Sequence, residues 1–350
     1  MSKIRILFTI PNFKTAGSQY VLLSLYRRID KTVFDPFICV ERFPETIPDD
    51  IPLHRQLTFA WTGSNFQDVK KFKNLLNQHQ IDILHSWDYK SNYLEALATR
   101  SANVKYVYTK KNNAWSKRWK LKSLLSSHIA YDNPDMKERF FDSWLFRNKI
   151  AFIPHGVDTA LFEPLEAEER QGFNLICIGN INANKNQMFL LKALRQLPER
   201  VVLYLYGKEE AHYRKQLDNY IIANNLTSRV FFNSYVINSN IPKILASMDL
   251  FLLPSLQEGL PVSILEALSC GVPVLSSNSG GGAKYIVSKG GGLIFEVDKT
   301  ESLVSHVRRL LQNPEELKLL SQKGRANVVN NFSLKFEIEA YEKLYKKIVQ

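Results

Sequence analysis

The sequence has few cysteines, no long apolar run and no repeated segment, and each absence excludes a class of protein. Its 350 residues include three cysteines, Cys39, Cys177 and Cys270, which stand apart among apolar neighbours. That spacing suits neither a disulfide framework nor a zinc site, so we expect buried free thiols in a reducing cytoplasm. No apolar run approaches the roughly 18 residues that a membrane-spanning helix needs. The first residues, MSKIRILFTIPNF, favour a β-strand over a signal peptide.

Acidic residues are missing from one long stretch of the chain. Residues 96–131 contain no Asp or Glu but eight Lys and Arg, and residues 1–155 hold 24 Lys and Arg against 14 acids. Within this stretch, WSKRWKLK at 115–122 interleaves tryptophan with basic residues, a composition that suits an anionic membrane surface. We expect peripheral membrane contact through residues 110–122, with a solvated basic face as the alternative. No nucleic-acid motif accompanies the charge, so no nucleic-acid partner is expected.

Strand-like and helix-like segments alternate along the whole chain. A length of 350 residues exceeds the usual size of one hydrophobic core, so two domains are expected. Strands alternating with helices of 10–15 residues are typical of parallel sheets built from βαβ units. The pattern breaks near residues 156–172 and then starts again. The sequence therefore predicts an α/β protein with two Rossmann-like domains, and ligands at the carboxyl ends of the strands.

The segment SLQEGLPVSILEALSCGVPVLSS at 255–277 places Glu258 in a loop after a strand and Glu266 in the next helix. Pro261 suits the start of that helix, and free N–H groups in its first turn would form an anion site between the two acids. A ligand with a central diphosphate and a hydroxyl-rich ring at each end, such as a nucleotide sugar, fits this spacing. Two solvent-facing glutamates around a core helix are the alternative.

This segment resembles the signature of the retaining GT-B glycosyltransferases of family 4, which build bacterial capsules, exopolysaccharides and lipopolysaccharides. IPHGVD at 153–158, ICIGNINANKN at 176–186 and SGGGAKYI at 279–286 extend the resemblance over nearly the whole chain. It implies the GT-B fold, with two Rossmann-like domains facing one another across a cleft. The implied parts are an acceptor-binding domain at 1–156, a connection at 157–172, a nucleotide-sugar-binding domain at 173–332, and a helix at 333–350 that packs back on the first domain.

The resemblance assigns a donor site residue by residue. Lys185 would contact the donor diphosphate and Glu258 the transferred sugar, which makes them the candidate catalytic residues. Glu266 would bind the ribose. Asn180 stands where the family usually has arginine, so stabilisation of the leaving group would depend more heavily on Lys185. The other donor-side candidates are Gly17, Tyr235, Gly259, Leu260, Pro261 and Val262.

Acceptor-side candidates follow one strand of the first domain. His85 fits the first position of a strand-end His-x-His pattern in which Trp87 replaces the second histidine. For His85, a strand-end histidine with satisfied hydrogen bonds is the alternative to a role in chemistry. Asp88 is a candidate to assist the acceptor hydroxyl, with capping of the next helix as its alternative. His155 replaces the asparagine usual in the connection, and we expect it to order that hinge.

The resemblance also implies the reaction. A hexose-type sugar would pass from a UDP-sugar to a hydroxyl of a glycan or lipid-linked acceptor, with retention, in cell-surface polysaccharide synthesis. No metal and no other cofactor is implied, and no His, Asp or Cys cluster has metal spacing. The enzyme would be cytoplasmic and peripheral at the inner face of the plasma membrane. A sugar-nucleotide epimerase or phosphorylase of the same fold, or a non-catalytic sugar-nucleotide-binding protein, is the alternative.

Overall fold

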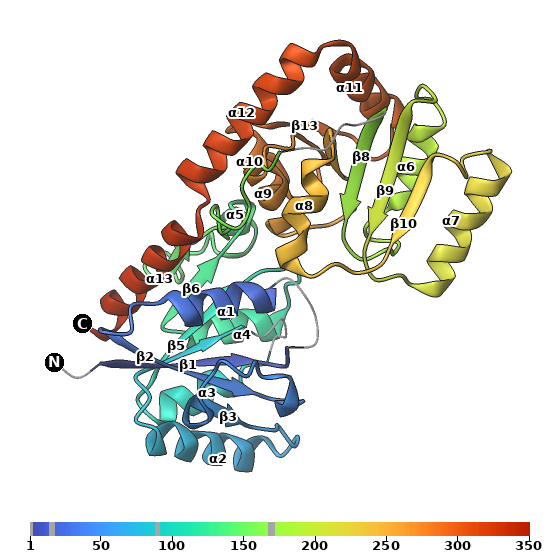
Figure 1. Cartoon of the computed structure of the whole chain (residues 1–350). Coiled ribbons are helices and arrows are strands. Elements are labelled where there is room, and N and C mark those ends of the chain that lie inside the picture. Colours follow the sequence, from blue (N-terminus) through green and yellow to red (C-terminus); the bar gives the residue numbers. More distant parts are fainter. Residues whose placement is uncertain (1–2, 14–17, 88–91, 167–171) are drawn as a thin grey trace. The chain divides into compact units, whose positions relative to one another are not determined.

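The structure, a computed structural model, describes residues 3–13, 18–87, 92–166 and 172–350. The chain forms two compact units, residues 1–155 with 336–350 (the N-terminal unit) and residues 156–335 (the C-terminal unit). Each unit is built on one parallel sheet whose strands are joined mainly through helices (Figure 1). The α/β class and the two Rossmann-like folding units are therefore confirmed.

The N-terminal unit contains a seven-stranded sheet in the order β3-β2-β1-β4-β5-β6-β7. The order reverses between β1 and β4, where Phe8 pairs with His85. Such a reversal marks the point at which ligands usually bind, beyond the carboxyl ends of the strands. The strands are β1 Ile4–Ile10, β2 Phe34–Val40, β3 Gln56–Thr58, β4 Ile83–Ser86, β5 Lys105–Lys110, β6 His128–Tyr131 and β7 Ile150–Phe152.

Helices connect most of these strands, and a last helix returns from the far end of the chain. The connecting helices and 3₁₀ turns are α1 Ser18–Arg28, η1 Pro44–Thr46, η2 Leu53–Arg55, α2 Asn65–Gln78, α3 Leu94–Ser101, α4 Lys117–Leu125 and α5 Asp135–Phe140. The returning helix is α13 Leu334–Val349. It buries Tyr341 and Tyr345 against this sheet, with the Tyr341 hydroxyl 3.0 Å from Oγ1 of Thr109.

The C-terminal unit contains a six-stranded sheet in the order β10-β9-β8-β11-β12-β13. Here the order reverses between β8 and β11, so the loops after these two strands are the expected place for a ligand. The strands are β8 Phe173–Ile178, β9 Val201–Tyr206, β10 Val230–Asn233, β11 Leu250–Leu253, β12 Val274–Ser277 and β13 Gly292–Phe295. The helices are α6 Gln187–Leu194, α7 Ala211–Ala223, η3 Asn238–Asn240, α8 Ile241–Ala246, α9 Val262–Ser269, α10 Gly282–Val287, α11 Thr300–Gln312 and α12 Pro314–Asn331.

Apolar runs such as KIRILFTI at 3–10 and NLICIGNI at 174–181 predict strands, and they contain β1 and most of β8. The strands β3 and β13 were not predicted. β3 has three residues and is exposed or half-buried throughout, so its sequence QLT carries too little alternation to detect. β13 begins at Gly292, a residue depleted in strands, where a Cβ would lie 2.5 Å from the carbonyl oxygen of Val274 on the neighbouring strand. Tertiary packing rather than local pattern therefore explains this second strand.

Candidate donor site

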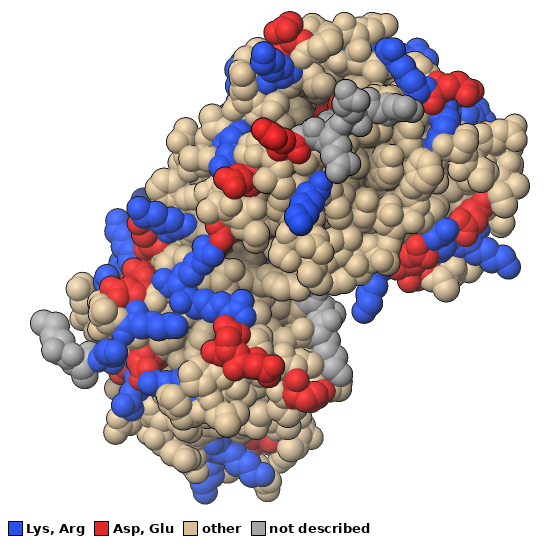
Figure 2. All heavy atoms as spheres, viewed as in Figure 1, with Lys and Arg blue, Asp and Glu red and all other residues tan. Residues whose placement is uncertain are grey.

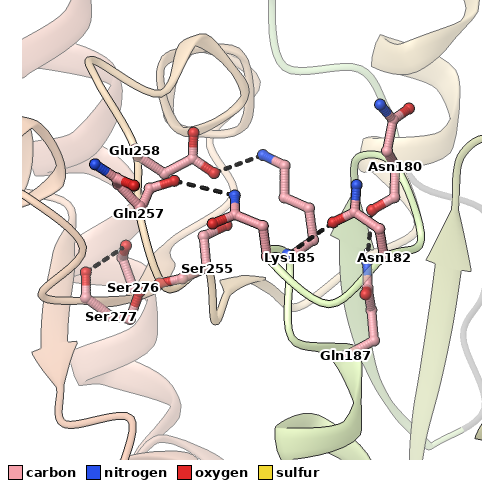
Figure 3. A network of polar contacts seen from close by, with 10 residues as sticks. Asn180, Asn182, Lys185, Gln187, Ser255, Gln257, Glu258, Ser276 and Ser277 are labelled. Atoms are coloured by element: carbon pink, nitrogen blue, oxygen red, sulfur yellow. Dashed lines mark hydrogen bonds and ion pairs between the residues drawn. The ribbon is translucent and has the colours of Figure 1, made fainter. Parts of the chain in front are cut away.

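Lys185 and Glu258 come together at the reversal point of the C-terminal sheet. Lys185 lies in the loop between β8 and α6, and Glu258 in the loop between β11 and α9. Nζ of Lys185 is 2.6 Å from Oε1 of Glu258, and both side chains are mostly buried, at 22% and 16% exposed. The two side chains point toward one another in Figure 3, and Asn180 lies apart from them. The residues assigned to the diphosphate and the sugar thus form one ion pair.

Asparagine side chains hold the two loops against each other. Oδ1 of Asn182 accepts a hydrogen bond from the backbone N–H of Lys185 at 3.0 Å. Nδ2 of Asn184 donates to the carbonyl of Gln257 at 3.1 Å, and the carbonyl of Asn184 accepts from the N–H of Leu256 at 2.8 Å. Because the two contacts of Asn184 join residues more than 70 positions apart, they fix the loop of Lys185 relative to the loop that carries Glu258.

Glycine allows a third segment to approach the loop of Glu258. A Cβ on Gly282, the first residue of α10, would lie 2.0 Å from the carbonyl oxygen of Gly259. The N–H of Glu258 donates to the carbonyl of Ser279 at 2.7 Å. No side chain larger than hydrogen fits at Gly282 without movement of this backbone. The glycine-rich segment 279–286 therefore supports the position of Glu258.

Glu266 lies within α9, whose N-terminus carries no side-chain cap. The carboxyl is only partly exposed, and desolvation raises its pKa to about 7 from the ordinary 4.5, against the lowering effect of a hydrogen bond with Asn238. A carboxylate that is desolvated in this way is stabilised by ligand hydroxyl groups, because they donate hydrogen bonds that replace its lost hydration. Leu260 and Pro261, at the start of the helix, are buried, so their backbone rather than their side chains is available to a ligand.

The other donor-side candidates differ in their surroundings. Asn180 is exposed, and its carbonyl accepts a hydrogen bond from Nε2 of Gln187 at 3.0 Å. Tyr235 follows β10 and is 45% exposed. Gly17 on the donor side and Asp88 on the acceptor side lie outside the described residues, so both assignments stay predictions.

His85 is enclosed in the N-terminal unit. Its Nδ1 lies 2.6 Å from the hydroxyl of Tyr345 and its Nε2 lies 2.8 Å from Oγ1 of Thr109. The ring is fully buried, and burial together with the charge of Lys111 holds its pKa well below the ordinary 6.5. These contacts favour the interpretation of His85 as a strand-end histidine with satisfied hydrogen bonds over a role with the acceptor.

His155 lies between two carboxylates that the sequence did not connect with it. Its Nε2 is 3.3 Å from Asp132, at the end of β6, and its Nδ1 is 3.0 Å from Glu337 of α13. Burial lowers the pKa of the ring, but the two carboxylates outweigh it and raise the pKa to about 9. A charged His155 therefore joins β6, the end of residues 1–155 and the returning helix within the N-terminal unit.

Only part of residues 110–122 is exposed. Lys110, Trp119 and Lys122 are buried, and Nζ of Lys110 lies 4.0 Å from the centre of the Trp119 ring. Burial lowers the pKa of Lys110 to about 7. The 3.6-residue helical period turns Trp119 and Lys122 inward, and the expected membrane contact of this stretch stays a prediction. Lys117, Arg118 and Lys120 remain exposed.

Other basic residues of the N-terminal unit lie on α13. On the face drawn in Figure 2, Lys and Arg side chains gather over α13, which carries the exposed Lys343, Lys346 and Lys347. The basic excess of this unit is therefore not confined to residues 110–122.

Three further expectations concern cysteine, metals and membrane spans. Cys39, Cys177 and Cys270 are free and buried, as predicted. Among the described residues, no group of three or more His, Cys, Asp or Glu side chains is placed to hold a metal ion. None of the helices in the described part of the chain combines the length and apolarity that crossing a bilayer requires.

Comparison with known proteins adds two family models and several relatives. A model described as "Glycosyl transferases group 1" matches residues 162–327, and one described as "Glycosyltransferase Family 4" matches residues 15–161. The UDP-Gal:alpha-D-GlcNAc-diphosphoundecaprenol alpha-1,3-galactosyltransferase of Escherichia coli is 26% identical, with 99% of this chain and 98% of the relative covered. The N,N'-diacetylbacillosaminyl-diphospho-undecaprenol alpha-1,3-N-acetylgalactosaminyltransferase of Campylobacter jejuni is 26% identical over 81% of each chain.

Solved structures share the fold of the whole chain. A glycosyltransferase from Rickettsia africae superposes with a TM-score of 0.88 at 17% identity, covering 100% of both chains. Anabaena Alr3699/HepE in complex with UDP superposes with a TM-score of 0.84 at 18% identity, covering 98% of this chain and 100% of that one. The predicted GT-B fold is therefore confirmed.

Proposed function

The chain belongs to the family 4 glycosyltransferases (glycosyl transferases group 1), and on that premise we propose the reaction that it catalyses. It transfers a hexose-type sugar from a UDP-sugar to a hydroxyl group of a lipid-linked or free glycan, with retention at the anomeric carbon. The observation that carries the proposal is the 2.6 Å contact between Lys185 and Glu258 at the reversal point of the C-terminal sheet.

The contact is suited to exchange with a diphosphate. In the free protein the charges of Lys185 and Glu258 neutralise one another, and both side chains are mostly buried. A nucleoside diphosphate carries more negative charge than one carboxylate, so it competes with Glu258 for Lys185. Glu258 is then released to accept hydrogen bonds from hydroxyl groups of the sugar. Donor binding would thus convert an ion pair inside the protein into two contacts with the donor.

The spacing along α9 extends this site to the ribose. N–H groups of its uncapped first turn, at Val262, suit a phosphate, as do the neighbouring backbone groups at Gly259 and Leu260. Glu266 follows one turn further, where its carboxylate accepts hydrogen bonds from the ribose hydroxyls. Asn180 and Tyr235 complete the proposed donor side.

The proposed chemistry needs no covalent intermediate. The acceptor oxygen bonds to the anomeric carbon on the face from which the phosphate oxygen departs, and the acceptor proton passes to that oxygen. The products are the glycoside and UDP. Lys185 and the start of α9 stabilise the charge on the departing diphosphate, so positioning and electrostatics supply most of the catalysis. No metal ion takes part in this scheme.

The names of the relatives support the acceptor and the donor of this proposal. Two of them act on sugars linked through diphosphate to undecaprenol, one uses UDP-Gal, and both form alpha linkages. Retention gives that linkage when the donor sugar is itself alpha-linked. By analogy, the N-terminal unit binds a lipid-linked acceptor in cell-surface polysaccharide synthesis, at the cytoplasmic face of the plasma membrane.

A donor screen tests the proposal. UDP-, GDP- and ADP-sugars are incubated with the full-length protein, with and without a polyprenyl-diphosphate-linked sugar, and released nucleotide is measured. We expect UDP-sugars to be hydrolysed slowly and transferred faster. Lys185→Ala and Glu258→Gln should each lose at least 100-fold in rate. Lys192→Ala on α6 and Glu210→Gln before α7 alter exposed residues of the same unit and should match the wild type.

The screen also separates the rival activities. An epimerase would convert the sugar without releasing nucleotide, and a phosphorylase would need inorganic phosphate in place of an acceptor. A binding protein would bind a sugar nucleotide without turnover. Any of these results, or wild-type rates in both Lys185→Ala and Glu258→Gln, would overturn the proposal.

A further inference from the structure

One tryptophan of the N-terminal unit is almost fully exposed. Trp144 lies in the turn between α5 and β7 and is 82% exposed, and Leu145 beside it is 40% exposed. Trp119, by contrast, is buried in the inner face of α4. A large apolar side chain in water is costly, and a cluster of them on a surface usually marks a place where another molecule binds.

The segment that carries Trp144 runs along α4. Next to the start of the helix, the Trp115 ring stacks on Phe140 with ring centres 4.9 Å apart. Beside the end of the helix, Nζ of Lys149 donates to the carbonyl of Leu124 at 2.9 Å. Because these two contacts join opposite ends of residues 140–149 to opposite ends of α4, the turn and the helix form one continuous surface.

The outward side of α4 is both basic and apolar. Leu121 and Leu124 are each 40% exposed and lie one turn apart on the helix. Lys117 stands one turn before Leu121, with Arg118 and Lys120 on either flank, and all three are exposed. This is the reverse of an ordinary amphipathic helix, in which exposed leucines do not occupy the centre of the solvent side.

Positive charge dominates the surroundings of these apolar side chains. Residues 115–125 and 141–149 contain six Lys and Arg and a single acid, Asp142. Of these six basic residues, Lys122 is buried and the other five are exposed or half-buried. We call the following set the α4 surface: Lys117, Arg118, Lys120, Leu121, Leu124, Trp144, Leu145 and Arg147.

We propose that the α4 surface binds the N-terminal unit to an anionic phospholipid bilayer, with Trp144 and the leucines entering the interface and the basic residues contacting the headgroups. Tryptophan prefers the boundary between headgroups and acyl chains, and cations near a surface with anionic lipid are attracted to it. The inference rests on the proposed function, because a lipid-linked acceptor would be presented at such a surface.

Vesicle co-sedimentation of the full-length protein tests this surface. We use vesicles of phosphatidylcholine alone and of phosphatidylcholine with 30% phosphatidylglycerol at about 0.1 M salt. Binding is expected only to the second. Replacing Lys117, Arg118 and Lys120 together with glutamine should weaken it on the order of 100-fold, since each basic residue contributes about fivefold. Trp144→Ser should weaken it about tenfold through the lost apolar contact.

Helix α2 offers matched controls in the same unit. Phe66 is 83% exposed there, close to the 82% of Trp144, and Lys70 and Lys71 are exposed. Phe66→Ser and the double change of Lys70 and Lys71 to glutamine should leave vesicle binding unchanged. If the control variants lose as much vesicle binding as the variants of the α4 surface, binding is not located on that surface and the proposal is wrong.

Quenching of tryptophan fluorescence by brominated phospholipid locates the contact directly. Bound wild-type protein should be quenched, and Trp144→Phe should bind with little change but lose most of the quenching. Quenching that persists in Trp144→Phe, or strong binding without quenching in the wild type, would overturn the insertion of Trp144. Vesicle binding that needs no anionic lipid would indicate another kind of partner and would also overturn the proposal.

Hydrolysis of the donor in solution is measured on the same protein samples. If the protein hydrolyses the donor but does not bind vesicles, the proposal for the α4 surface is refuted and the proposed function is not. Vesicle binding without any hydrolysis or transfer would refute the proposed function and leave the surface standing.

Discussion

Replacing Glu266 with glutamine is expected to stabilise the C-terminal unit at alkaline pH and to weaken nucleotide binding. The carboxyl has a pKa of about 7 in the folded protein against an ordinary 4.5. The folded protein therefore binds this proton more tightly than the unfolded chain does, and stability falls as pH rises between these two values. At pH 8 the cost is about 3 kcal/mol, because each tenfold change in proton affinity corresponds to about 1.4 kcal/mol.

Glutamine is nearly isosteric, stays neutral and can still accept a hydrogen bond from Asn238. Glu266→Gln should therefore melt about 5–10 °C above the wild type at pH 8, because 1 kcal/mol moves the melting temperature of a unit this size by about 2–4 °C. The difference should disappear near pH 4.5, where the wild-type carboxyl is also protonated. UDP affinity at pH 8 should fall about 10- to 100-fold, since a hydrogen bond to a charged group contributes about 1.5–3 kcal/mol.

Thermal denaturation from pH 4.5 to 8 and calorimetric titration with UDP measure both effects. Asp249→Asn is unsuitable as a control, because its carboxylate accepts the N–H of Asn174 at 2.7 Å. Glu301→Gln on α11 is suitable, because that side chain is exposed and lies in the same unit. The reasoning is refuted if Glu266→Gln melts at or below the wild type at pH 8, or if the difference does not depend on pH.

Three further predictions follow from the packing and charges of the two units. The pKa of His155 is raised to about 9 from 6.5, so its contribution to stability is complete below pH 6.5 and lost as pH rises through 9. Thermal denaturation at increasing pH should show this loss of stability in the wild type and not in His155→Asn. Gly282→Ala forces a Cβ to within 2.0 Å of the Gly259 carbonyl oxygen, and we expect at least a tenfold loss of donor turnover from the displaced loop; unchanged turnover would contradict the supporting role of this glycine. Transfer should survive treatment with EDTA, and a loss restored by Mg²⁺ or Mn²⁺ would disprove metal independence.

Much of the fold was predictable because parallel sheets leave a local signature. Their strands are buried on both faces and read as short apolar runs, and the intervening helices have a different period. The runs that become β1, β2, β8 and β9 are of this kind. The three-residue β3 has no such signature, and its pairing with β2 is decided by the surrounding unit.

The candidate site could be assigned only through the resemblance to a family. Nothing local in the sequence brings Lys185 to Glu258, which lie 73 positions apart, and the pairing of His155 with Asp132 and Glu337 has no local signal either. Composition did not show which residues of 110–122 are exposed, because charge and tryptophan content do not say which side of a helix is buried. Trp144 was missed for the same reason, as its exposure depends on how the turn packs along α4.

The central claim is that Glu266, Lys185 and Glu258 bind the ribose, the diphosphate and the sugar of one donor. Calorimetric titration with uridine, UDP and a UDP-sugar tests it most directly, using the wild type and one variant at each residue. The account predicts that Glu266→Gln weakens all three ligands and that Lys185→Ala weakens UDP and the UDP-sugar but not uridine. It also predicts that Glu258→Gln removes any gain in affinity from UDP to the UDP-sugar. Uridine binding weakened as much as UDP binding by Lys185→Ala, or UDP binding unchanged by it, would contradict the account.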